Sequence, residues 1–140
     1  MRQIQDVQAR VQAACGTADM LGAAWDAFTL LLDTCEAGVG SSPGLFAAFA
    51  FAAAAASRGR LMLESAPSLP PGVGSQASQG AVVKQDLEQA AGALGGLAAT
   101  LGETLGQAAV EAADAGDRAA CQDAAVQAMR IAELLSGDHR

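Results

Sequence analysis

The side chains that most often perform catalysis are scarce in this sequence, and those present are not spaced for it. Among 140 residues there is one histidine, His139, next to the last residue. General acid–base and nucleophilic catalysis usually need a histidine, or a pair of carboxylates held in a cleft, close to an activatable group. We therefore expect no catalytic residues and no enzyme activity.

The cysteines do not indicate a metal site or a disulfide framework. Cys15, Cys35 and Cys121 are odd in number, widely spaced, and form no Cys-x-x-Cys pair. Secreted disulfide scaffolds and zinc sites both need paired cysteines at short, defined spacings. The Glu-x-x-His pair that builds di-metal sites in helical bundles is also missing from the sequence. We expect no metal, and reduced thiols in a cytoplasmic protein.

Phosphate-containing ligands are disfavoured as well. Neither Gly-x-Gly-x-x-Gly nor Gly-Lys-Ser/Thr occurs among the 16 glycines, so no cofactor is predicted. A net charge of −7 and a pI near 4.4 argue against nucleic acid, which is bound largely through basic side chains. Arg58 and Arg60 lie near the end of a predicted helix, and we interpret them as partners of its C-terminal dipole.

The elements that would position any site are helices, and the first is predicted to be long. Apolar and small residues alternate three and four apart, as on one face of a heptad helix. They are Ile4, Val7, Val11, Ala14, Ala18, Leu21, Trp25, Phe28, Leu32 and Cys35. This predicts one helix over about 3–37, roughly 50 Å long, that ends near Gly38 and Gly40.

The remaining boundaries follow from caps and breakers. Ser42 and Pro43 predict the start of a helix over about 43–65, and the prolines and glycines after it predict a linker over 66–78. A third helix over about 79–115 is predicted from an apolar face formed by Val83, Leu87, Leu94, Leu97, Leu101 and Leu105. Gly116 and Asp117 indicate a tight turn with Asp117 as N-cap of a fourth helix, over about 117–136.

Together these elements predict an all-α fold and one domain over residues 1–140. The fold class is a four-helix bundle made of two helical hairpins, each long then short, joined by the Pro/Gly-rich linker. The N-terminal residues are polar rather than basic and then apolar, so no signal peptide is predicted. The uncharged stretch 37–57 has an apolar helical part of only about 14 residues, or roughly 21 Å, too short for a transmembrane segment.

The helix predicted over 43–65 is apolar on two opposite sides. Phe46, Phe49, Ala53, Ala56 and Leu63 share one side. The other side carries Ala47, Phe51, Ala55 and Met62. A helix that is apolar all round is either enclosed by its neighbours or has a second contact surface. We expect Ala47, Phe51, Ala55 and Met62 to form an interface with another protein or a second copy.

Glycines gather on one side of the third predicted helix. Gly92, Gly95, Gly102 and Gly106 lie within about 80° of one another on a helical wheel. Five internal glycines, with Gly96, cost roughly 4–5 kcal/mol relative to alanine. These four glycines are our candidates for a close contact with another helix, although Glu88 and Glu103 share that side, which leaves solvent exposure open.

The acidic, alanine-rich composition is similar to that of the small helical-hairpin substrates of type VII secretion. Those proteins carry Trp-x-Gly in a turn between two helices, whereas here Trp25, Asp26 and Ala27 lie inside the predicted first helix. A tryptophan at an inward heptad position is expected in the core. We assign no family on this basis, and predict a non-catalytic cytoplasmic adaptor or accessory subunit that binds a protein partner, with self-association expected. An exported type VII-like protein and a bundle that holds a small apolar ligand remain as alternatives.

Overall fold

The computed structural model describes residues 2–39, 46–70 and 87–135, and within them the chain is entirely helical. The helices are α1 (Arg2–Ala13), α2 (Thr17–Val39), α3 (Phe46–Glu64), α4 (Leu87–Glu111) and α5 (Ala115–Leu135). No strand occurs in these residues, which confirms the prediction of an all-α fold.

The single long helix predicted over 3–37 is wrong, because the chain turns between α1 and α2. Gly16 has a φ of +83°, a left-handed conformation that glycine adopts without steric cost. The carboxylate of Asp19, in the first turn of α2, accepts a hydrogen bond of 3.0 Å from the backbone N–H of Cys15. A straight helix of roughly 50 Å would carry its first turns beyond the other helices. Turning back instead buries Ile4 and Val11.

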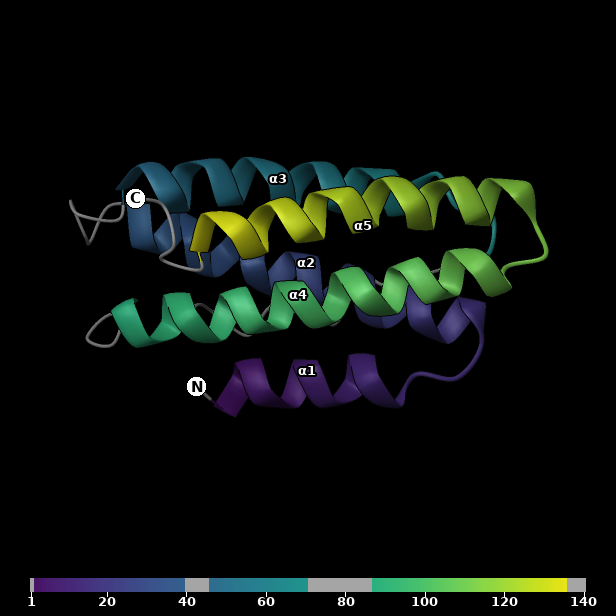
Figure 1. Cartoon of the computed structure of the whole chain (residues 1–140), viewed down its shortest axis with the longest axis horizontal. Helices are drawn as coiled ribbons and strands as arrows, with labels where there is room; N and C mark the ends of the chain where they lie inside the picture. The colour runs from purple at the N-terminus through teal and green to yellow at the C-terminus, as the bar shows by residue number, and fades with distance from the viewer. Residues whose placement is uncertain (1, 40–45, 71–86, 136–140) are drawn as a thin grey trace.

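Helix α3 lies at one edge of the molecule and packs against both α2 and α5, whereas α4 packs against the side of α5 that faces away from α3 (Figure 1). Helix α1 lies against both α2 and α4, and so covers the seam between them. The seam also carries polar contacts, because Gln8 of α1 donates a hydrogen bond of 3.0 Å to the Thr100 hydroxyl of α4. Within the described residues the four predicted helices are thus replaced by five, since the first is divided in two.

Large aliphatic side chains from α4 and aromatic side chains from α2 and α3 fill the core. The predicted leucine face of α4 is buried at Leu94, Leu97, Leu101 and Leu105. Phe28 of α2 and Phe49 of α3 are fully buried, and each ring lies over a glycine of the opposite helix. Phe49 lies over Gly38, and Phe28 lies over Gly59, where a Cβ would overlap the rings. Gly38 therefore lies in the contact between α2 and α3. Helix α2 ends at Val39, which agrees with the predicted end near Gly38 and Gly40.

The turn between α4 and α5 differs from the prediction in its cap. Helix α4 ends at Glu111 and α5 begins at Ala115, so the boundaries at 115 and 117 are wrong. Asp114 is the N-cap, since its Oδ1 accepts hydrogen bonds from the backbone N–H groups of Gly116 and Asp117, at 2.7 and 3.1 Å.

Asp117 has a different function from the predicted cap. Its buried carboxylate accepts hydrogen bonds from the backbone N–H and the hydroxyl of Ser68, at 2.9 and 2.6 Å. Pro67 also lies beside Gly116, and Pro70 lies beside Gly22 of α2. The first residues of the predicted linker are therefore held against the ends of α2 and α5. Residues 71–78 of that linker lie outside the described part of the chain.

Candidate interaction surface on the outer side of α3

The side of α3 that faces away from α2 and α5 carries large apolar side chains in solvent. Phe46, Phe51 and Leu61 are 53%, 63% and 61% exposed. Ala47 and Ala54 are exposed between them. We call these five residues the α3 outer face. Exposed phenylalanine and leucine side chains gathered on one helix are typical of a contact surface, whereas single exposed apolar residues are ordinary.

The predicted interface matches this surface only in part. Ala47 and Phe51 are exposed, but Met62 is half-buried against the core and Ala55 is only 1% exposed. Because α3 packs on α2 and α5 at the same time, its buried side is wide and includes Ala55.

Phe46 and Leu61 belong to the α3 outer face and were absent from the predicted interface. Phe46 was grouped with the core side chain Phe49, three residues later. Phe49 lies over Gly38, which is one residue before the end of α2. Phe46 is about one helical turn before Phe49 in α3, and so lies beyond the part of α2 that could cover it. Leu61 could have been found from the sequence, because it follows the predicted interface residue Ala47 by 14 residues, close to four helical turns, and so lies on a similar side of the helix.

A groove of about 500 Å³ separates the outer sides of α3 and α5. Its lining is Phe51, Ala54 and Arg58 from α3, with Arg130, Glu133 and Leu134 from α5. Both arginines are exposed. The groove therefore has two positive charges and one negative charge, from Glu133, beside Phe51 in a chain whose net charge is −7, so the surface around the α3 outer face is less acidic than the protein as a whole.

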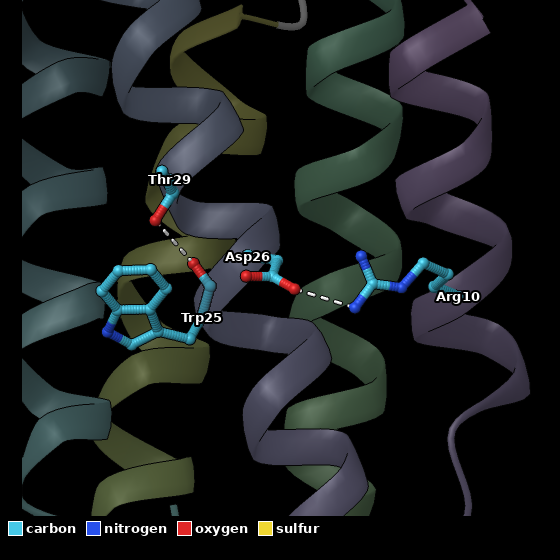
Figure 2. Close-up of polar contacts among 4 residues, drawn as sticks. All are labelled: Arg10, Trp25, Asp26 and Thr29. Carbon is cyan, nitrogen blue, oxygen red and sulfur yellow. Dashed lines mark hydrogen bonds and ion pairs between the residues drawn. The ribbon is translucent and has the colours of Figure 1, made fainter. Parts of the chain in front are cut away.

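The inner edge of α3 is fixed to α2 by an arginine. The Arg60 guanidinium lies 5.0 Å from the centre of the Trp25 ring, a cation–π distance, and its Nη1 donates to the Thr29 hydroxyl at 3.3 Å. The Thr29 hydroxyl in turn donates to the Trp25 carbonyl at 3.0 Å (Figure 2). Neither Arg58 nor Arg60 is in the last turn of α3, so their predicted pairing with the helix dipole is wrong. Trp25 is half-buried against the core.

The opposite side of α2 is fixed to α1 by an ion pair. Arg10 Nη2 lies 2.8 Å from Asp26 Oδ2 (Figure 2). Asp26 follows Trp25 directly, so consecutive side chains of α2 point to α3 and to α1, and hold a neighbour on each side. With α2 attached on both sides, α3 rests on a well-packed support.

The glycines of α4 fall into two groups. Gly95 lies 3.6 Å from the Leu135 backbone of α5, measured from the Cβ position, and Gly102 lies under the Met129 side chain. Gly92 and Gly106 face open space. The stripe proposed for a close helix contact is therefore in contact with α5 at Gly95 and Gly102, and is open at the other two positions.

Two of the three cysteine thiols are buried, and their pKa values are raised. Burial, together with the neighbouring Glu36 carboxylate, raises the pKa of Cys35 to about 12. Burial and Asp117 also raise the pKa of Cys121. Both thiols thus stay protonated and unreactive, while Cys15 is exposed. No group of three histidine, cysteine or acidic side chains in the described residues is placed to hold a metal ion. His139 lies outside these residues.

A second hollow, of about 390 Å³, lies between the α1–α2 turn and α4. Most of its lining is polar, from Gln12, Thr17, Thr100, Glu103, Thr104, Gln107 and Glu111. Such a lining does not suit an apolar ligand in this hollow, because apolar ligands need mostly apolar walls.

Among the described helices, α3 is long and apolar enough to cross a membrane by length and composition alone, and 39% of that stretch is buried within the fold. A helix with one side in a protein core passes the same test, because its buried residues raise the mean hydropathy. No protein-family model, no curated protein and no solved structure matches this chain.

Proposed function

We propose that this protein is a non-catalytic, cytoplasmic helical adaptor or accessory subunit that binds a protein partner through the α3 outer face. The observation that carries the proposal is the exposure of Phe46, Phe51 and Leu61 on one helix whose opposite side is firmly packed. Leaving three such side chains in water costs free energy, which a partner recovers by covering them.

The packing beneath α3 supports this function. Phe49 and Phe28 interlock with glycines across the α2–α3 contact, and Arg60 adds a polar contact at its edge. A face held in this way is preorganised, so little conformational entropy is lost when a partner binds. The free thiols Cys35 and Cys121 suit a reducing compartment, which supports the cytoplasmic location.

The scaffold that we propose behind this surface is a bundle of two hairpins, α2–α3 and α4–α5, joined through the linker at 66–78. The packing of α2 on α3 and of α4 on α5 supports it, as does the anchoring of Ser68 to Asp117. Helix α1 then serves as a cover over the α2–α4 side, opposite to the proposed interface.

The test replaces Phe51 with aspartate and uses a matched control on another helix. Val110 of α4 is 84% exposed, so Val110→Asp adds the same charge at a site outside the α3 outer face. Wild type, Phe51→Asp and Val110→Asp would serve as baits, with bound proteins quantified by mass spectrometry and self-association followed by sedimentation velocity. We expect Phe51→Asp alone to lose a partner, with affinity at least tenfold lower, equal to about 1.4 kcal/mol or more. If every interaction of the wild type survives Phe51→Asp, the proposed function is wrong.

A further inference from the structure

The α3 outer face has a pattern of sizes that is complementary to itself. Ala54 lies near its middle, with Ala47 and Leu61 seven residues to either side, and Phe51 and Ser57 three residues to either side. In these two pairs, a large side chain on one side of Ala54 corresponds to a small one on the other. All five of these residues are exposed. Phe46, at the end of the face, corresponds to Met62, which is half-buried against the core.

From this pattern we propose that the partner of the α3 outer face is a second copy of the chain, with the two α3 helices antiparallel about a two-fold axis through Ala54. This inference rests on the proposed function and names its partner. In an isologous interface each residue meets the symmetry-related position. Leu61 then lies opposite Ala47 of the second copy, Phe51 opposite Ser57, and the two Ala54 residues meet at the axis.

The charges on α3 favour the same arrangement. The sequence has 15 acidic residues, yet Glu64 at the end is the only one in α3. Two acidic chains can therefore meet here without opposing carboxylates along the helix. Arg58 follows Ser57, and so reaches the Phe51 ring of the second copy, where a cation–π contact can form. The two Arg58 residues are eight residues apart along the axis, about 12 Å, beyond the screening length of about 8 Å at physiological salt.

The size of the face indicates a reversible dimer. Helix α3 is 19 residues long, or about 28 Å. Helices of this length bury less than the 800 Å² or so per partner that is usual for stable complexes. The groove beside Phe51 adds Arg130, Glu133 and Leu134 from α5 to the contact, and the Glu133 carboxylate lies there together with the Arg58 and Arg130 guanidinium groups. We expect dimers that dissociate on dilution and whose population rises with protein concentration.

Disulfide cross-linking tests both the partner and its direction. In a Cys15→Ser background, the remaining cysteines, Cys35 and Cys121, are buried. Ala54→Cys should form a covalent dimer rapidly under mild oxidation, because the two thiols meet at the axis. Ala9→Cys, exposed on α1, is the control and should cross-link at least tenfold more slowly.

The direction follows from a mixing experiment. Ala47→Cys and Leu61→Cys should cross-link when the two variants are mixed, but hardly when each is alone. Identical positions lie 14 residues apart along antiparallel helices, about 21 Å. Self-linking of each variant without mixed product would show parallel helices and overturn the proposed arrangement.

Two further results separate failure of this inference from failure of the proposed function. If the wild type stays monomeric at high concentration and Ala54→Cys cross-links slowly, the proposal that the partner is a second copy of the chain is wrong. The adaptor function would then still stand if Phe51→Asp loses a different protein. Flotation with phosphatidylglycerol–phosphatidylcholine vesicles that requires Phe51 and Leu61, without any protein partner, would overturn both, because the occupant would be a membrane surface.

Discussion

Phe49 and Phe51 are two residues apart in α3 and lie in opposite environments. Phe49 is fully buried over Gly38, whereas Phe51 is 63% exposed beside Arg58. On a helix, two residues correspond to a turn of about 200°, so the two rings must point to opposite sides. The difference teaches that the apolar composition of α3 serves two purposes: one side stabilises the fold, and the other is available for a partner.

The largest expected effect is on folding, and it appears when Phe49 and Phe51 are each replaced by aspartate and the two variants are compared. Phe49→Asp puts an unpaired charge in the core, which costs several kcal/mol out of a typical domain stability of about 5–15 kcal/mol. We expect this variant to be unfolded or insoluble. Phe51→Asp should change the free energy of unfolding by no more than about 0.5 kcal/mol in the monomer, as surface substitutions usually do. Urea denaturation at low protein concentration measures both, and equal destabilisation would contradict the division of α3 into two sides.

The next effect in size concerns the glycines beneath the rings. Gly59→Ala places a Cβ in overlap with Phe28. Overpacking costs about 1–3 kcal/mol, only part of which is offset by the gain of about 1 kcal/mol in helix propensity. Gly96→Ala is the control, because nothing lies within 4 Å of its Cβ position. We expect Gly96→Ala to raise the melting temperature and Gly59→Ala to lower it. A rise for both would show that Phe28 can move away at little cost.

The two arginines of α3 give a smaller contrast. Arg60→Met removes the contact with the Trp25 ring and the hydrogen bond to Thr29, and should destabilise the protein by about 1 kcal/mol. Arg58→Met, on the outer side, should leave stability unchanged and affect only association. Trp25 fluorescence gives an independent readout, since its emission should shift in the Arg60 variant alone. An emission shift in both variants would indicate that Arg58 also supports the α2–α3 contact.

The smallest expected effect concerns the buried thiol of Cys35, which changes the stability of the fold only at high pH. Its pKa is raised from 9.0 to about 12 in the folded protein, so the unfolded chain loses this proton at lower pH than the folded one. The contribution of the protonated Cys35 thiol to the free energy of unfolding is therefore fully present below pH 9, and it is lost as pH rises from 9 toward 12. Cys35→Ala should flatten the fall in stability over this range, measured by urea denaturation. Cys15, which is exposed, provides the control, and an identical fall in Cys35→Ala and Cys15→Ala would contradict this assignment.

Local signals in the sequence were sufficient to predict the buried face of α4. The spacing of Leu94, Leu97, Leu101 and Leu105 predicted the buried face of α4, and all four are buried. The prediction of Phe51 as a surface residue also rested on spacing alone. The same spacing argument wrongly placed Ala55, four residues later, on the surface. Helix α3 contacts both α2 and α5, so its buried side is wider than a single row of residues and includes Ala55.

Helix-cap signals were less reliable, because two aspartates near the start of α5 are both suitable N-cap residues. Asp114 and Asp117 are both good N-cap residues by type. Asp114 caps α5, and Asp117 instead binds Ser68, which is 49 residues away in the sequence. The sequence contains no local sign of that partner, so the choice between the two carboxylates could not be made from it.

The sequence by itself determined that the described chain is helical, since helix formation depends on residue spacing and propensity within a few turns. Only the tertiary structure decided where α1 lies. The heptad pattern runs through Gly16 without interruption, and a straight helix satisfies it as well as a turn does. The turn prevails because Ile4 and Val11 become buried against other helices and Arg10 reaches Asp26. Contacts of this kind join distant segments, and their free energy outweighs that of the few helical hydrogen bonds lost at Gly16.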